Sequence, residues 1–329
     1  MTGESNHHAA YGLILETDAP VFGFGPAPDR KAADVRFWLD SQPDWAATAA
    51  MLPRRQGLWS RATDANSRLG RKVYALGNEE FFHIVYPDQT EFMVSADGRR
   101  VHGAWVAPLT LADTLTYALG PITSICLRRM GRACLHSSAV AWDQGAVLFV
   151  GCAGSGKSTT AAALVQRGAA AVTDDVAAID LLGETPAIHP GHAWYRLWPD
   201  SVRLLCGSET ALPLLTPNWD KRYLDADHLA VRNAGPLPIV SVYFLEDGLH
   251  TRSGSLITRL LPRDAFLRFL ANTLGAPFVD AAGRAHEFRV LSRLAQTVPC
   301  SALDTCHSTL PLNGLLDAIE HDVMCPVSS

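Results

Sequence analysis

A glycine-rich segment in the middle of the chain has the residue types and the spacing of a phosphate-binding site. Residues 151–160 read GCAGSGKSTT and fit the pattern G-x-x-x-x-G-K-[ST], in which backbone N–H groups surround the phosphates of a nucleotide. In such a loop, Lys157 would bridge the β- and γ-phosphates, and the Ser158 hydroxyl would be a ligand of Mg²⁺. This Walker A pattern predicts a site for ATP and Mg²⁺. The residues expected to bind the nucleotide are Gly151, Cys152, Ala153, Gly154, Ser155, Gly156, Lys157, Ser158 and Thr159.

The segments on either side of the motif must position it. Before it, residues 146–150 read AVLFV, a short apolar run that is typical of a buried strand. After it, Ala161, Leu164 and Val165 recur at helical spacing until Gly168, a common helix terminator. The predicted order of strand, glycine loop and helix is the one that nucleotide binding requires. A plain Gly- and Ser-rich turn between a strand and a helix is the alternative.

Two adjacent acids follow the predicted helix at the end of a short strand-like run. Asp174 and Asp175 come directly after residues 169–173, AAAVT. A carboxylate at this edge of a sheet would face the bound phosphates, where an acid associated with Mg²⁺ belongs. With two acids, one can hold the metal while the other accepts a proton from a hydroxyl group. A solvated Asp-Asp turn is the alternative interpretation.

Two further candidates lie outside these motifs. His136 precedes the hairpin that leads into the loop strand, although a lone histidine is more often structural than catalytic. Residues 219–223 read WDKRY, a basic and aromatic insert that we expect in a loop. This insert is either a surface feature or the source of a cation for a transferred phosphoryl group.

The remaining sequence suggests two parts. A change to helical spacing over residues 109–130 predicts a helix interrupted near Gly120-Pro121, and helical spacing returns after Pro262. Strand-like runs occur at residues 11–15, 35–39, 81–86, 91–94 and 239–246. We predict an α/β protein with a β-rich N-terminal lobe over residues 1–125. A second domain over residues 126–329 would end in a helical C-terminal cap.

The composition excludes several classes of partner. The 329 residues are 48% hydrophobic and 19% charged with a net charge of −5, which argues against a nucleic-acid partner. No apolar run approaches the length needed to span a membrane, and the first residues lack the pattern of a secretion signal. Seven cysteines without zinc-type spacing are expected to be reduced thiols, which favours a cytoplasmic location.

Several of these segments together resemble the HPr kinase/phosphorylase family. The run LHSSAV at residues 135–140, the phosphate loop, RGA at 167–169 and TDDV at 173–176 occur in the family's order and approximate spacing. The likeness covers residues 135–180 and fades towards Glu246. It implies an HPr-kinase-like P-loop core and phosphoryl transfer from a nucleotide to a serine hydroxyl of a peptide or small protein.

The resemblance also implies roles for individual residues. Lys157 and Ser158 match the phosphate and Mg²⁺ residues, and Asp174 matches the acid that activates the acceptor hydroxyl. Asp175 matches the neighbouring acid, which we assign to the metal, and His136 matches the family's histidine before the loop. The family's arginine after a Trp-Asp-Lys stretch corresponds to Arg222.

The acceptor and the assembly state follow from the same resemblance. The glycine-rich signature that follows the acid pair in HPr kinase/phosphorylases is absent from this sequence. The resemblance is therefore strongest to compact HPr-kinase-like proteins, which include precursor-peptide kinases of lasso peptide clusters. A homo-oligomer is also implied. A regulatory ATPase without an acceptor and a small-molecule kinase are the alternatives.

Overall fold

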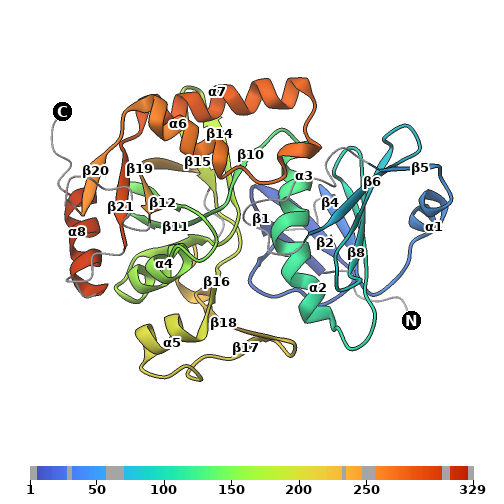
Figure 1. Cartoon of the computed structure of the whole chain (residues 1–329), viewed down its shortest axis with the longest axis horizontal. Coiled ribbons are helices and arrows are strands. Elements are labelled where there is room, and N and C mark those ends of the chain that lie inside the picture. Colours follow the sequence, from blue (N-terminus) through green and yellow to red (C-terminus); the bar gives the residue numbers. More distant parts are fainter. Residues whose placement is uncertain are drawn as a thin grey trace.

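The computed structural model describes residues 6–27, 32–56, 70–231, 235–246, 256–305 and 312–324. Within these ranges the protein is a mixed α/β structure with two nine-stranded sheets and a third sheet of three strands (Figure 1). None of the helices in these ranges is long and apolar enough to cross a membrane.

The first sheet is formed by the N-terminal third of the chain and has the strand order β3-β1-β2-β4-β9-β8-β7-β6-β5. It includes the four strand-like runs predicted before residue 100, which are confirmed as β2, β4, β7 and β8. A short helix, α1 (Asp44–Ala50), lies at its edge. The strands are β1 (Asn6–Ala10), β2 (Leu13–Thr17), β3 (Gly25–Pro26), β4 (Val35–Trp38), β5 (Arg54–Gln56), β6 (Lys72–Leu76), β7 (Phe81–Val85), β8 (Glu91–Ser95) and β9 (Arg100–Ala104).

A helical connection links the first sheet to the second and lies between them in Figure 1. It consists of α2 (Leu111–Tyr117), a π-helical turn (Ala118–Ile122) and α3 (Thr123–Arg129). The predicted interruption near Gly120-Pro121 corresponds to this π-helical turn, which separates the two α-helices while the chain stays helical. Proline has no N–H group for the regular ladder, and the wider turn accommodates it.

The second sheet holds the predicted loop strand and has the strand order β10-β14-β15-β19-β12-β11-β13, with β21 beside β19 and β20 beside β21. Strand β19 confirms the predicted strand at residues 239–246. The strands are β10 (Ala133–Leu135), β11 (Ser137–Trp142), β12 (Gly145–Val150), β13 (Ala170–Thr173), β14 (Ala177–Leu182), β15 (Thr185–His189), β19 (Leu237–Glu246), β20 (Ile257–Arg259) and β21 (Cys300–Asp304).

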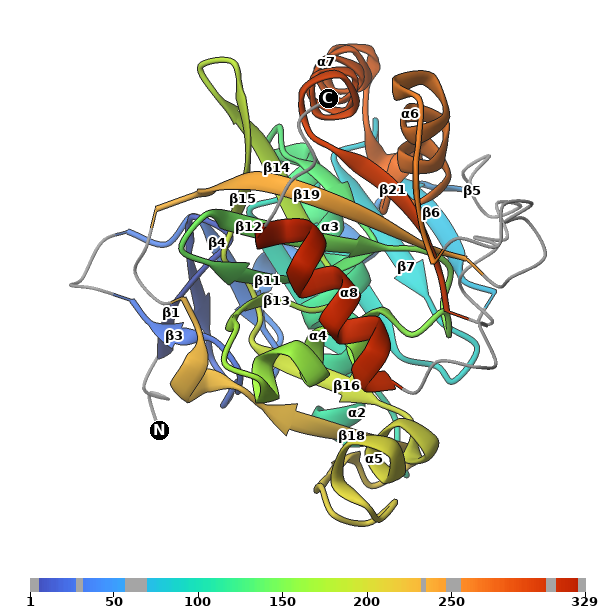
Figure 2. The same ribbon diagram turned by 90° about the vertical axis from the view of Figure 1, so that its left-hand side faces the viewer.

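Helices cover both faces of this sheet. On one face lie α4 (Lys157–Gln166) and α8 (Leu312–Met324); on the other lie α6 (Pro262–Ala271) and α7 (Ala281–Thr297) (Figures 1 and 2). Along β12, Val147 and Phe149 belong to the core that includes α4, whereas Leu148 and Val150 belong to the core that includes α6 and α7. Burial on both faces explains why this strand reads as a continuous apolar run.

Two predictions for the second half of the chain need correction. The C-terminal region is not purely helical. In the chain, β21 comes between α7 and α8, and it joins the second sheet in parallel with β19. Residues 219–223 do not form a loop; they lie in β18 (Trp219–Asp225), the middle strand of the third sheet. The other members of this subdomain are β16 (Trp194–Leu197), β17 (Leu214–Thr216) and α5 (Pro199–Cys206).

The first and second sheets are packed against each other. Tyr11 is fully buried, and its N–H donates to the Pro190 carbonyl oxygen at 2.6 Å. A Cβ at Gly191 would overlap the Tyr11 ring and the Thr173 hydroxyl. The hydrophobic core around Tyr11 also contains Val176 of the second sheet region, so it continues across residue 125.

Candidate active site

The predicted strand and helix around the glycine loop, residues 151–156, are confirmed as β12 and α4. Gly154 and Gly156 have φ angles of 86° and 96°, in the left-handed region that favours glycine. A Cβ at Gly151 would lie 2.8 Å from the Ser155 hydroxyl oxygen. The glycines of the pattern are thus required by the backbone path of this loop.

Polar groups of the loop are arranged to meet an anion. Lys157 is 5% exposed, and its Nζ donates to the carbonyl oxygens of Gly151 and Cys152 at 2.8 Å each. Burial lowers the pKa of Lys157, although the two nearby acids oppose this effect. The Ser155 hydroxyl is buried and has no hydrogen-bond partner among the described residues. These residues fit nucleotide phosphates, because an anion would satisfy both the free hydroxyl and the lysine.

Asp174 follows β13 and contacts the start of α4. Its Oδ1 accepts hydrogen bonds from the hydroxyls of Ser138 (2.5 Å) and Ser158 (2.8 Å). Its Oδ2 accepts from the backbone N–H of Arg196 at 2.9 Å. The side chain is buried, and burial together with the charge of Asp175 raises the pKa of Asp174. Three donors hold this carboxylate beside the first turn of α4.

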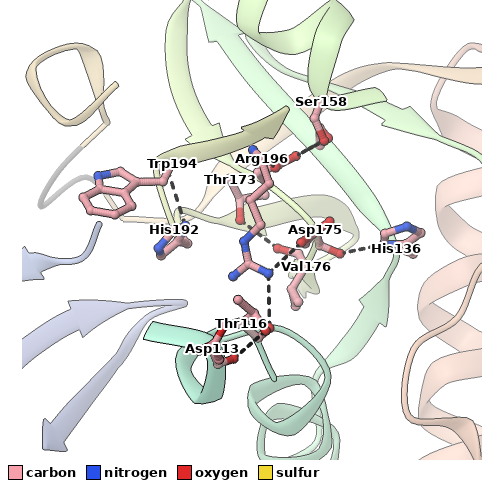
Figure 3. A network of polar contacts seen from close by, with 12 residues as sticks. Asp113, Thr116, His136, Ser158, Thr173, Asp175, Val176, His192, Trp194 and Arg196 are labelled. Carbon is pink, nitrogen blue, oxygen red and sulfur yellow. Dashed lines mark hydrogen bonds and ion pairs between the residues drawn. The ribbon is translucent and has the colours of Figure 1, made fainter. Parts of the chain in front are cut away.

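Asp175 lies in a different environment although it is the next residue. Its φ of 65° is in the left-handed region, a strained conformation that is common at functional sites. Its side chain is 25% exposed, and Oδ2 forms an ion pair with Arg196 Nη1 at 3.0 Å (Figure 3). Burial alone would raise the pKa of Asp175, but the Arg196 guanidinium lowers it below the usual value. Asp175 is therefore the ionised acid that solvent can reach.

His136 lies next to the acid pair. Its Nδ1 is 3.1 Å from the carbonyl oxygen of Asp175, so Nδ1 is the donor and Nε2 is the acceptor of the neutral ring (Figure 3). Burial, reinforced by the charge of Lys157, lowers the pKa of His136. In this position the ring supports the backbone of Asp175.

The contact between the acid pair and the expected Mg²⁺ ligand differs from the sequence prediction, which placed Asp175 at the metal. Ser158, the expected Mg²⁺ ligand, is hydrogen-bonded to Asp174 rather than to Asp175. No cluster of three or more His, Cys, Asp or Glu side chains suited to a metal occurs among the described residues. A hydroxyl and one carboxylate still fit Mg²⁺, which commonly takes one or two protein ligands together with substrate phosphates and water.

Strand β18 brings Lys221, rather than Arg222, towards the acids. The charge of Lys221 acts on the pKa values of Asp175 and His136, and its Nζ lies 4.9 Å from the ring centre of Trp219. Arg222 instead donates to the Leu212 carbonyl oxygen at 2.6 Å. Adjacent residues of a strand point to opposite faces, so when Lys221 faces the site its neighbour Arg222 faces away from it. The assignment of Arg222 is not supported by this geometry.

Three contributors escaped prediction: Ser138, Arg196 and Lys221. Ser138 lies within the LHSSAV run, but nothing in the run singles out its hydroxyl. Arg196 lies in β16, far from every recognised motif, and its link to the acids depends on the third sheet. Strand alternation through residues 219–223 could have identified Lys221 if the segment had been recognised as a strand.

Comparison with known proteins finds distant likenesses among solved structures. No protein-family model matches the chain, and no curated protein matches it. Among solved structures, the HPr(Ser) kinase/phosphatase from Coxiella burnetii aligns over 58% of this chain and 97% of its own length. The identity is 16% and the TM-score is 0.31.

Proposed function

We propose that the protein is a kinase that uses ATP and Mg²⁺ to phosphorylate a serine hydroxyl of a peptide or small protein. One observation carries this proposal: of two adjacent acids, one is hydrogen-bonded to the helix after the glycine loop and the other is paired with an arginine. The hydrogen bond between Ser158 and Asp174 links the loop helix to one acid, and Arg196 keeps the other acid ionised. A site that only binds a nucleotide has no need for the second, solvent-accessible carboxylate.

The loop residues would bind the nucleotide. Lys157 would exchange the carbonyl oxygens of Gly151 and Cys152 for the β- and γ-phosphates, while the N-terminus of α4 and the Ser155 hydroxyl supply further donors. Ser158 and Asp174 would hold Mg²⁺, which neutralises phosphate charge when bound.

Asp175 would accept the proton of the acceptor hydroxyl. The acceptor oxygen forms a bond to the γ-phosphorus, the bond from phosphorus to the leaving oxygen of ADP breaks, and the proton passes to the Asp175 carboxylate. The Asp175 carboxylate is ionised at neutral pH and can therefore accept the proton, although the lowered pKa that Arg196 causes makes it a weaker base. The assignment reverses the division of roles implied by the resemblance, because Asp174 is buried beneath three donors.

Lys221 would stabilise the transferred phosphoryl group. Two indole rings hold its ammonium, with Nζ 5.0 Å from the Trp198 ring centre and 4.9 Å from that of Trp219. Such cation–π contacts restrict the long side chain before substrate arrives. A positioned cation acts on the charge that spreads over the phosphoryl oxygens during transfer.

The resemblance in sequence favours a precursor peptide, such as those of lasso peptide clusters, as the acceptor. The test is incubation of the protein with ATP, Mg²⁺ and short serine-containing peptides, followed by mass spectrometry. We expect slow ATP hydrolysis by the protein alone and transfer of one phosphate to a peptide, which is lost when its serine is replaced by Ala. Rapid ATP hydrolysis that never yields a phosphorylated peptide would contradict the proposal and favour a regulatory ATPase.

A further inference from the structure

A pocket of about 410 Å³ lies near the acid pair, between α2, β16, the β17 segment with the turn after it, and the segment before β3. Its volume is within the range of small-ligand pockets. Most of its lining is carbon. Six of the lining residues are Phe22, Leu111, Leu115, Leu119, Trp194 and Leu215. The walls thus come from segments that are far apart in the sequence.

Arg196 connects this pocket to the proposed proton acceptor. Its Nη1 lies 3.0 Å from Asp175 Oδ2 and donates to the Thr116 carbonyl oxygen at 3.2 Å, and both Thr116 and Arg196 line the pocket. Figure 3 shows the guanidinium between Asp175 and α2, with His192 and Trp194 on the same side of the site. The pocket therefore begins one side chain away from the carboxylate of Asp175.

The charge of the pocket favours an uncharged occupant. Arg196 is the charged residue of its lining and is already paired with Asp175. His192 also lines the pocket, and burial lowers its pKa to about 3, so this ring is neutral. An additional charge in the pocket would be desolvated without a free partner, whereas an apolar side chain would lose only its contact with water.

Two stacked aromatic rings line one side of the pocket, and one of them is largely exposed to solvent. Phe22 is 59% exposed and stacks on Trp194, with ring centres 5.8 Å apart and an interplanar angle of 6°. The Trp194 Nε1–H is buried and has no acceptor among the described residues, so it can donate to a peptide carbonyl. Exposed, stacked aromatic rings beside an apolar cavity are typical of recognition surfaces.

The walls are held in place by hydrogen bonds outside the pocket. The Thr110 hydroxyl and the Asp113 carboxylate form a capping box at the start of α2. Asn218 Nδ2 donates to the same carboxylate at 2.9 Å and to the Pro108 carbonyl oxygen at 3.2 Å, which ties the β17–β18 turn to this helix. A preformed cavity binds its ligand without the cost of ordering its walls.

We propose that this pocket binds a bulky apolar side chain next to the acceptor serine. The inference depends on the proposed kinase function and specifies its substrate class: a peptide with Leu, Phe or a similar residue adjacent to the serine. Consecutive residues of a peptide are about 3.8 Å apart, so the neighbour of a serine at Asp175 is close enough to enter the pocket on the Arg196 side of the site. The part of the chain before residue 125 then has a role in choosing the acceptor.

The test uses matched peptides in which one serine is flanked by Gly, Leu, Phe or Asp. Their affinity is measured by calorimetry with the full chain, Mg²⁺ and a non-hydrolysable ATP analogue, and phosphate transfer from ATP is measured separately. We expect the Leu or Phe peptide to bind about 10- to 100-fold tighter than the Gly peptide, because a large apolar side chain is buried. The Asp peptide should bind no tighter than the Gly peptide.

Amino-acid substitutions test whether the preference for an apolar neighbour comes from this pocket. Ala112 lines the pocket, and Ala112→Trp should fill it and abolish the advantage of the Leu and Phe peptides. Ala47→Trp makes the same change at an exposed position of α1 and should keep the advantage. Phe22→Ala changes an exposed residue and should reduce the advantage several-fold, so it tests the surface if Ala112→Trp does not fold.

The possible results separate the two proposals. Equal affinity for Leu and Gly peptides, or an advantage that survives in Ala112→Trp, would overturn the pocket assignment even if phosphate is transferred. An apolar preference that disappears in Ala112→Trp, without transfer to any peptide, would support the pocket as a peptide site and overturn the kinase proposal.

Discussion

The two halves of the candidate site are built in opposite ways. The phosphate half is local: residues 151–156 lie between β12 and α4, residues 157 and 158 begin α4, and backbone geometry accounts for most of its shape. The acceptor half is assembled from distant segments, in which Arg196 of β16 contacts both Asp175 and the Thr116 carbonyl of α2. Local geometry can be encoded by a motif, whereas the acceptor half depends on how separate elements pack.

The acid pair lies between these two halves, and its two neighbouring residues each contact a different half. Asp174 faces the loop helix through Ser158, and burial raises its pKa. Asp175 instead pairs with the Arg196 guanidinium, which lowers its pKa against the effect of burial. Adjacent carboxylates can therefore perform different steps, because the pKa of each is set by its own neighbours.

The largest expected effect comes from the acid on the acceptor side. Asp175→Asn should reduce turnover by about 10²- to 10⁴-fold, the usual contribution of a positioned general base. Nucleotide affinity should change little, because Asp175 does not contact the loop helix. Steady-state kinetics and calorimetry measure the two quantities.

Two other substitutions complete this test of the acid pair. Asp174→Asn should mainly raise the Mg²⁺ concentration needed for half-maximal activity, and Asp143→Asn, at an exposed turn, should change neither property. If Asp174→Asn removes turnover at saturating Mg²⁺ while Asp175→Asn retains it, the roles of the acids are the reverse of our assignment.

A smaller effect is expected on the phosphate side. Lys157→Ala removes a charge-assisted contact with the phosphates worth about 1.5–3 kcal/mol, so the affinity for ATP should fall roughly ten- to a hundredfold. Calorimetry with ATP and Mg²⁺ gives this value, and Lys72→Ala at an exposed position of β6 is the control. Unchanged affinity in Lys157→Ala would exclude the glycine loop as the phosphate site.

Strand β18 offers a test with two neighbouring cations. Lys221→Ala should lower kcat about tenfold, as expected for the loss of one charge-assisted contact in the transition state. Arg222→Ala should leave kcat nearly unchanged, because its guanidinium bonds to the Leu212 carbonyl. The opposite ranking in steady-state kinetics would restore the role that the sequence assigned to Arg222.

The smallest expected effect is on stability. The pKa of Asp174 is raised in the folded state, so the free energy of unfolding of the wild type should rise relative to Asp174→Asn as pH falls from about 7 towards the ordinary Asp value. The pKa of Asp175 is lowered, so its contribution should stay constant over the same range and be lost only below the ordinary value of 3.8.

Chemical denaturation at several pH values measures this difference. A wild-type advantage over Asp175→Asn that already shrinks between about pH 7 and pH 4 would contradict the environments assigned to the two acids.

The sequence was informative where the chemistry is local. The buried strand and the helix around the loop were predicted from apolar spacing and glycine positions, and His136, Asp174 and Asp175 lie close together at the loop. The roles of the two acids were not accessible, because both carboxylates look the same until Ser158 and Arg196 are placed beside them.

Prediction failed where distant packing overrides local pattern. Residues 300–304 read CSALD, which contains no strong strand signal, and they form β21 because they fit beside β19. Reading residues 219–223 as a loop concealed the alternation that turns Lys221, rather than Arg222, towards the acids.

The contact of Tyr11 with the end of β13 has a consequence for how the protein unfolds. Its ring fills the space beside Gly191 and Thr173, and Thr173 directly precedes Asp174. Melting of the N-terminal hairpin would remove the support of the strand end that carries both acids. We therefore expect one cooperative transition for the two sheets, and a fragment that starts near residue 126 should not hold Asp174 and Asp175 in their observed positions.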